Sequence, residues 1–215
     1  MRKWTSLGLA IAATAMATTS VAAQQASPSW NGFYAGLNAG GMFGNTSASF
    51  AGPAGPGGFS GAGSGFVGGA QAGYNYLLGP VVLGGEIDFQ GSTFAQSVNG
   101  GSGFGPFSTT ERTPWFSTMR ARLGYPVGSV MPYLTGGAAF GDIKGTSGGS
   151  FSKTAVGWTA GGGVEYAFLH NWSAKLEYLY VDLGKATCSA ACSGGSPIDV
   201  TATTQIVRGG LNYKF

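Results

Sequence analysis

The last segment of the chain, residues 200–215, most constrains what the protein can fold into. Val207, Leu211 and Tyr213 occupy odd positions there, whereas Arg208 and Asn212 occupy even positions. Because successive side chains of a β-strand point to opposite faces, this segment is apolar on one face and polar on the other. At the edge of a soluble sheet such a strand would be prone to aggregation. A barrel that pairs its last strand with its first has no edge, so the segment predicts a closed β-barrel in a membrane, with its apolar face toward lipid.

The same period-two pattern recurs along the chain. Met119 and Leu123, for example, alternate with Arg120 and Arg122. We predict strands at about 33–40, 65–76, 81–91, 115–125, 131–141, 155–168, 172–183 and 200–215, of which only 131–141 has an ambiguous facing. Most are close to the length that a tilted membrane strand needs, roughly 9–11 residues. The predicted fold class is all-β: an eight-stranded antiparallel up-and-down transmembrane β-barrel.

Short and long connections alternate between these strands. Tight turns are predicted at 78–80, 126–129 and 169–171, and four long Gly- and Ser-rich loops at about 44–64, 92–114, 142–153 and 184–199. Outer-membrane barrels have short periplasmic turns and long outer loops, so the four loops are expected outside the cell. Aromatic residues near strand ends are expected to form the periplasmic girdle: Phe33, Tyr76, Trp115, Tyr125, Phe168, Trp172 and Phe215.

The first residues have the features of an export signal. Arg2 and Lys3 precede an apolar stretch at 7–13, and small residues at 21–23 suggest cleavage after Ala23. We therefore predict a signal peptide at 1–23 and one outer-membrane β-barrel domain at 24–215. Only 9% of residues are charged, against about 25% in ordinary soluble domains. No apolar run after the signal is long enough for a membrane helix, and no basic patch indicates nucleic-acid binding.

The charged residues inside the predicted strands lie on the faces opposite the aromatic residues. A basic residue facing lipid at the membrane midplane costs about 2–4 kcal/mol, so these side chains are expected in the lumen. The interior of an eight-stranded barrel is only wide enough for side chains to fill, so acids and bases should pair there. Counting from the turns suggests the pairs Glu165–Lys175 and Glu86–Arg120. The predicted structural network comprises Glu86, Asp88, Arg120, Arg122, Glu165, Lys175, Glu177, Arg208 and Lys214.

Few residues remain that could carry chemistry. Cys188 and Cys192 lie in the last outer loop, where a small disulfide is the expected state in an oxidising compartment, with a metal site as the weaker alternative. His170 is the single histidine and falls in a predicted periplasmic turn, away from outer-loop serines. We predict no catalytic, cofactor-binding or metal-ligating residues, and no enzyme activity.

Three motifs resemble a known family. The opening 30–40 (WNGFYAGLNAG), the segment 132–137 (PYLTGG) and the closing 209–215 (GGLNYKF) are similar to the small outer-membrane β-barrel proteins of alphaproteobacteria, often called the porin family. The resemblance covers the mature chain and implies an abundant surface antigen that contributes to envelope integrity. It also implies that Phe215 is read by the outer-membrane assembly machinery. Porin or haem-binding roles are proposed for some members.

These observations favour a structural outer-membrane protein whose partners are membrane lipid and the assembly machinery. The oligomeric state stays open. One alternative is a porin for small solutes, which is kept open by lumen glycines that could leave space: Gly36, Gly73, Gly84, Gly124, Gly161 and Gly163. The other is a binder that uses its outer loops for adhesion or haem.

Overall fold

The computed structural model describes residues 29–52, 55–102, 105–146, 150–188 and 198–215, and in these residues the protein is built of β-strands. No helical segment in this part of the chain could cross a bilayer. The strands are β1 (Gly32–Gly52), β2 (Gly55–Leu78), β3 (Val81–Ser92), β4 (Ala95–Ser102), β5 (Gly105–Arg112), β6 (Trp115–Gly124), β7 (Val130–Thr146), β8 (Ser150–Ala167), β9 (Trp172–Cys188) and β10 (Ile198–Lys214).

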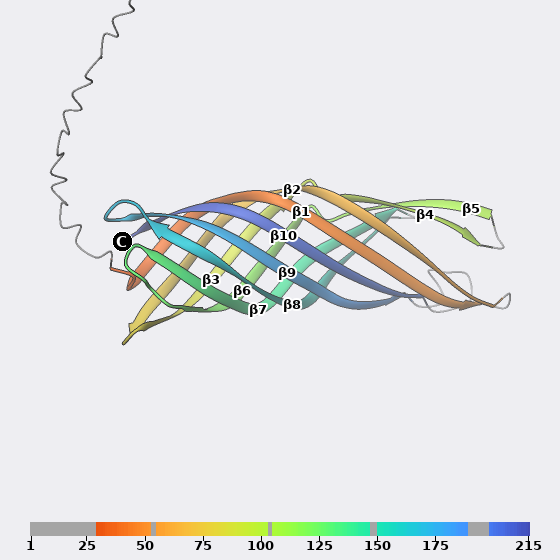
Figure 1. The fold of residues 1–215 in the computed structure, drawn as a ribbon. Helices are drawn as coiled ribbons and strands as arrows, with labels where there is room; N and C mark the ends of the chain where they lie inside the picture. Colours follow the sequence, from red (N-terminus) through yellow and green to blue (C-terminus); the bar gives the residue numbers. More distant parts are fainter. Residues whose placement is uncertain (1–28, 53–54, 103–104, 147–149, 189–197) are drawn as a thin grey trace, which may run out of the picture.

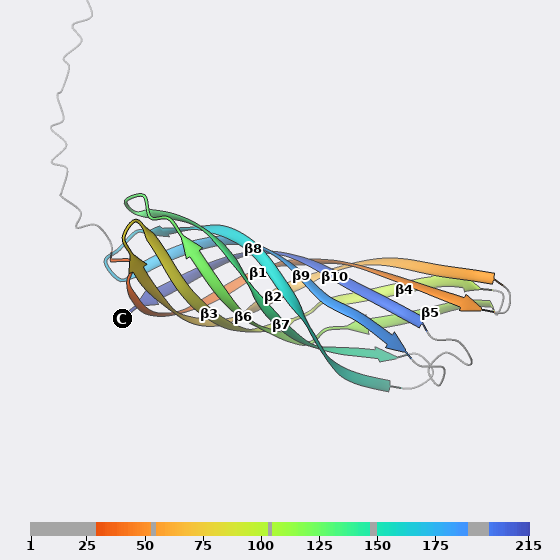
Figure 2. The ribbon, with the colours of Figure 1, turned by 90° about the horizontal axis from the view of Figure 1, so that it is seen from below.

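The strands form a closed antiparallel barrel (Figures 1 and 2). β4 continues β3, and β5 continues β6, because β2 pairs first with β3 and then with β4, and β7 pairs in the same way with β6 and β5. These two strand pairs therefore serve as two barrel strands, which makes eight in all. β1 closes the barrel by pairing with β10 from Tyr34–Lys214 to Phe50–Ile198. The predicted fold class is confirmed.

The strands extend well past the predicted loop boundaries. β1 and β2 remain paired as far as Gly52 and Gly55, through most of the predicted loop 44–64. The predicted loops 92–114, 142–153 and 184–199 likewise contain β4 and β5 and the ends of β7, β8, β9 and β10. Antiparallel pairing satisfies backbone groups whatever the side chains are, so Gly- and Ser-rich sequence without alternation still forms ribbons. The ribbons project from the end of the barrel opposite the chain's C-terminus (Figure 2). We call the end with the ribbons the ribbon end, and the end with the C-terminus the turn end.

The turn end contains the three predicted short connections. Gly79 and Gly128 adopt φ values of 59° and 60°, which lie in the left-handed region that glycine adopts without steric cost. The predicted signal peptide, residues 1–23, lies outside the described residues. So does Cys192, and with it the expected disulfide to Cys188.

The outer surface of the barrel is apolar. Leu37 and Leu134 expose 70% and 68% of their surface, and the odd-numbered residues Val207, Leu211 and Tyr213 of β10 also point outward. At the turn end, Tyr213 lies 5.2 Å from the ring of Trp172 and 5.3 Å from that of Phe215. The prediction that Trp115 belongs to the aromatic girdle at this end is wrong. β6 begins at the ribbon side, where Trp115 pairs with Gly91 and stacks on Phe89.

Candidate functional site

The interior of the barrel contains a layer of buried charges, which we call the ionic layer. Its members come from β3, β6, β8, β9 and β10, and each is at most 4% exposed. Acids and bases are equal in number, so the layer has no net formal charge. The members are Glu86, Asp88, Glu165, Glu177, Arg120, Arg122, Lys175 and Arg208.

Arg120 lies at the centre of this layer. Its Nη2 contacts a carboxylate oxygen of Glu86 and lies 2.9 Å from Oδ2 of Asp88. Its Nη1 lies 3.0 Å from Oε1 of Glu177, which belongs to β9. β6 and β9 are not neighbours in the sheet, so this ion pair crosses the lumen.

Lys175 and Arg208 make further contacts across the lumen. Nζ of Lys175 lies 2.9 Å from both carboxylate oxygens of Glu86 on β3. Nη2 of Arg208 lies 2.8 Å from Oδ2 of Asp88 and 2.6 Å from Oε2 of Glu177. The carboxylate of Glu177 thus bridges two guanidinium groups, and β3 is tied directly to β9 and β10.

Arg122 and Glu165 form a second group nearer the turn end. Nη2 of Arg122 contacts the Glu165 carboxylate, and its guanidinium lies 3.8 Å from the ring centroid of Tyr133. The predicted register of Glu165 with Lys175 is present, but Lys175 directs its ammonium group to Glu86 instead. The predicted Glu86–Arg120 pair has both the register and the ionic contact. Pairing across the narrow lumen therefore competes with pairing between neighbouring strands.

Lys214 lies apart from the ionic layer, in contrast to our expectation. It is the last residue of β10, and its Nζ donates a hydrogen bond to the backbone carbonyl oxygen of Ser29 at the turn end. Because it lies at the end of the strand, it is closer to the turn end than the residues of the ionic layer are. Phe215 follows with 75% of its surface exposed, and its backbone N–H donates to the carbonyl oxygen of Phe33 at 3.0 Å.

Neutral polar side chains complete the ionic layer, and the sequence analysis did not single them out. Tyr34 donates to Glu86 at 2.8 Å and Tyr133 donates to Glu177 at 3.0 Å. Asn38 donates to Gln71 at 2.9 Å, and Gln71 in turn donates to Asn212. Apart from Tyr133 on β7, whose facing the sequence left ambiguous, these residues lie on the strand faces that were predicted to point into the lumen. Strand parity could therefore have identified them.

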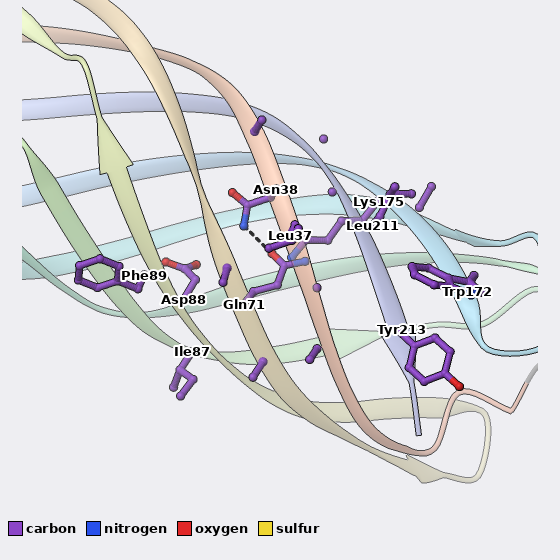
Figure 3. A pocket seen from close by; sticks show the side chains of 18 of the residues that line it. Leu37, Asn38, Gln71, Ile87, Asp88, Phe89, Trp172, Lys175, Leu211 and Tyr213 are labelled. Atoms are coloured by element: carbon purple, nitrogen blue, oxygen red, sulfur yellow. Dashed lines mark hydrogen bonds between the residues drawn. The ribbon is translucent and has the colours of Figure 1, made fainter.

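Figure 3 shows one wall of the barrel at this level, with Asn38 and Gln71 joined by their hydrogen bond. Ile87 and Tyr213 point away from the barrel. An open groove of about 1300 Å³ follows this wall, and its lining is mainly alanines and larger apolar side chains, with Gln71, Asp88 and Lys175 beneath them. Since the groove opens on the lipid-facing surface, its apolar lining matches the lipid chains that surround the barrel.

A cluster of buried apolar residues lies in the lumen on the ribbon side of the charges. Along β9, Leu179 and Val181 follow Glu177 on the same face, and Ile206 precedes Arg208 on β10. We call this cluster the ribbon-side apolar layer; its buried members are Met42, Val67, Phe94, Phe116, Ala139, Leu179, Val181 and Ile206.

A smaller apolar cluster lies on the turn side of the charges. It consists of Trp30, Val82, Met131 and Ala167, and we call it the turn-side apolar layer. Val82 and Met131 are completely buried, and Trp30 is 8% exposed. The charged section of the lumen is thus bounded by apolar side chains on both sides.

The six lumen glycines that could have left space for solutes are crowded instead. A Cβ atom on Gly73 would lie 2.4 Å from the Tyr34 ring, and one on Gly84 would lie 2.4 Å from Oδ1 of Asn75. Gly124 faces the sulfur of Met131 in the same way, at 2.8 Å. Gly36, Gly161 and Gly163 are equally close to neighbouring backbone or side-chain atoms. These glycines make room for large neighbours and for close strand approach.

The described residues offer no group of three or more His, Cys, Asp and Glu side chains that could bind a metal ion. Most carboxylates of the ionic layer are instead shared with guanidinium or ammonium groups.

Comparisons with known proteins agree with this architecture. The family model described as "Outer membrane protein beta-barrel domain" matches residues 10–215. The chain belongs to this outer-membrane β-barrel family. It is 39% identical to the 31 kDa outer-membrane immunogenic protein of Brucella melitensis, over 98% of this chain and 97% of that one. It is 33% identical to the 22 kDa outer membrane protein of Rhizobium leguminosarum, over 72% of this chain and 64% of that one.

Among solved structures, this β-barrel protein is similar in fold to OprG of Pseudomonas aeruginosa, with a TM-score of 0.53 and 13% identity. The superposition covers 86% of this chain and 98% of OprG. The family, the relatives and the barrel together place the protein in the bacterial outer membrane. By the general rule for such barrels, we expect the turn end to face the periplasm and the ribbon end to face outward.

Proposed function

We propose that this protein is a non-enzymatic structural component of the outer membrane, with a closed lumen, that presents its ribbons at the cell surface. The observation that carries the proposal is the order of layers in the lumen, with charges between two apolar clusters. Apolar constrictions exclude water and ions from a pore. The ionic layer itself leaves few charges free to guide a solute, because each of its basic groups is paired with a carboxylate.

The crowded glycines support a closed lumen over a porin. A conducting eight-stranded barrel would need small lumen residues that leave a continuous path. Here Tyr34, Met131 and Asn75 occupy the space beside such residues.

Conductance in planar bilayers tests the closed lumen. Protein purified from outer membranes, and shown by gel mobility to be folded, is expected to give no steady current steps. Reproducible steps whose size or ion selectivity changes in Arg120→Ala would overturn the proposal and establish a porin.

We also propose that the ribbons act as surface antigens. The relative in Brucella melitensis is named an immunogenic outer-membrane protein, and the ribbons of this barrel extend from its outward end. Antibodies raised against the purified barrel should label intact cells. Labelling seen only after the outer membrane is permeabilised would contradict surface presentation.

Finally, we propose that Phe215 is recognised by the outer-membrane assembly machinery. The exposed ring at the end of the closing strand supports this role. Phe215→Ala should lower the amount of protein in the outer membrane while Phe33→Ala, another exposed aromatic residue at the turn end, lowers it less. Equal loss in the two variants would indicate a general effect on the girdle.

A further inference from the structure

The short segment Ser29–Asn31 crosses the turn end of the barrel before β1 begins. Trp30 packs among Val82, Met131 and Ala167 and is only 8% exposed. Its Nε1–H donates to the carbonyl oxygen of Gly128, in the turn between β6 and β7, at 3.3 Å. A large side chain from outside the strands therefore completes the turn-side apolar layer.

The residues on either side of Trp30 anchor the segment to other parts of the turn end. Oδ1 of Asn31 accepts a hydrogen bond from the backbone N–H of Leu77, near the end of β2, at 3.1 Å. The carbonyl oxygen of Ser29 accepts from Nζ of Lys214. Gly32 has a φ of 125°, so the chain turns from this segment into β1 at a residue without a Cβ.

Trp30 and part of the ionic layer line the same small cavity at the turn end. This cavity of about 30 Å³ is lined by Tyr34, Asn75, Glu165 and Ser173, as well as by Trp30 and by residues 169–171 between β8 and β9. Glu165 is the carboxylate that pairs with Arg122, and Tyr34 donates to Glu86. Removal of the Trp30 ring would open a direct route from the periplasm to these groups.

The segment is held more weakly than the barrel wall. Residues 29–31 have no strand assignment, and their contacts are one packed ring and a few hydrogen bonds. Segments with few contacts open locally without global unfolding. The neighbouring strands are instead held by continuous ladders on both sides.

We propose that Ser29–Asn31 is a strap that closes the periplasmic mouth, with Trp30 as its plug, and that it can open while the barrel remains folded. The ribbon-side apolar layer then still closes the lumen, which is the part of this inference that rests on the proposed function. The strap thus makes the periplasmic half of the ionic layer accessible without making a pore.

Thiol labelling tests the strap. Asn75 lines the cavity and is 5% exposed, and Asn75→Cys places a reporter there in a Cys188→Ser/Cys192→Ser background. A charged thiol reagent added to folded, detergent-solubilised protein should react slowly with this reporter. Adding Trp30→Ala should accelerate the reaction by more than about tenfold, because the local opening step is no longer required. Trp30→Phe should restore most of the protection.

Tyr166→Ala is the matched control, because Tyr166 lies near the same end, faces outward with 51% exposure and does not line the cavity. It should leave the labelling rate unchanged. Equal rates with and without the Trp30 ring, or the same acceleration in Tyr166→Ala, would overturn the strap. If Trp30→Ala does not fold, Asn31→Ala, which removes only the anchor to Leu77, decides the question with a smaller expected acceleration.

Conductance of Trp30→Ala separates this inference from the proposed function. We expect fast labelling together with no current. Fast labelling with steady current would retain the strap but contradict closure by the ribbon-side apolar layer. Slow labelling with no current would retain the closed lumen but remove the strap.

Discussion

The ionic layer and the ribbon-side apolar layer fill neighbouring sections of one lumen by opposite means. On β9 the two layers are directly adjacent: Glu177 belongs to the ionic layer, and Leu179, the next residue on the same face of the strand, belongs to the apolar layer. Both side chains are almost completely buried. Glu177, however, depends on named partners across the lumen, whereas Leu179 requires only apolar neighbours of suitable volume. Equal burial therefore implies unequal tolerance to substitution.

The largest effect is expected for Glu177→Ala. The change leaves Arg120 and Arg208 buried with one partner fewer, and removing one member of a buried ion pair costs about 3–5 kcal/mol. Urea unfolding of the barrel from lipid vesicles, followed by tryptophan fluorescence, measures this loss. Leu176→Ala, on the preceding position and facing lipid, should lower the unfolding free energy by only about 1–2 kcal/mol, because it loses apolar transfer from water to lipid but leaves no buried charge unpaired. Similar losses in both variants would remove the distinction between lumen and lipid faces.

Glu165→Ala should cost about 3 kcal/mol, the lower end of the range for a broken buried ion pair. Glu165 has one ionic partner, Arg122, and that guanidinium keeps its contact with the Tyr133 ring when the carboxylate is removed. The same unfolding measurement applies. An unchanged unfolding free energy would show that this pair contributes nothing to stability.

Leu179→Met should cost less than about 1.5 kcal/mol, because volume-conserving apolar exchanges are tolerated in packed interiors. Leu179 is fully buried, so the small effect would reflect chemistry and not exposure. A loss as large as that of Glu177→Ala, again from urea unfolding, would mean that the apolar layer is as specific as the ionic layer.

The smallest effect is expected from salt. Raising the ionic strength from about 0.05 M to about 1 M screens exposed charges strongly and buried pairs much less. Because the charges of the ionic layer are at most 4% exposed, the unfolding free energy should stay nearly constant. A steep decline with salt would show that ions reach the layer. Potassium chloride is the appropriate salt for this titration, since sulfate also strengthens apolar burial.

Period-two alternation was sufficient to predict the barrel and the direction of nearly every lumen charge. Arg120 and Arg122 lie inside and Met119 outside because a strand leaves no other choice. The ionic partners across the lumen were harder to predict. They depend on which residues the tilt and stagger of eight strands place at the same level of the barrel. Lys175 was therefore assigned to Glu165, its neighbour in register, although its ammonium group lies against Glu86.

Other features had a signal in the sequence that alternation did not isolate. Leu179 and Ile206 share the parity of lumen charges, which indicates an apolar section of the interior. The ribbons were missed because Gly and Ser residues carry no alternation, although their backbone pairs as well as any other. Trp30 belongs to no strand, so its burial could be known only once the turn end had been assembled.

The seam between β1 and β10 has a consequence for how the protein is made. The contact of Ser29 with Lys214 joins residues 185 positions apart, and every pair along the seam is comparably distant in sequence. Folds dominated by such non-local pairings form slowly, because the entropy of closing the loop must be overcome before contacts repay it. Without β10, the strands β1 and β9 would each have one unpaired edge. We therefore expect a chain that ends before β10 to be unable to close its barrel, and its open strand edges to promote aggregation.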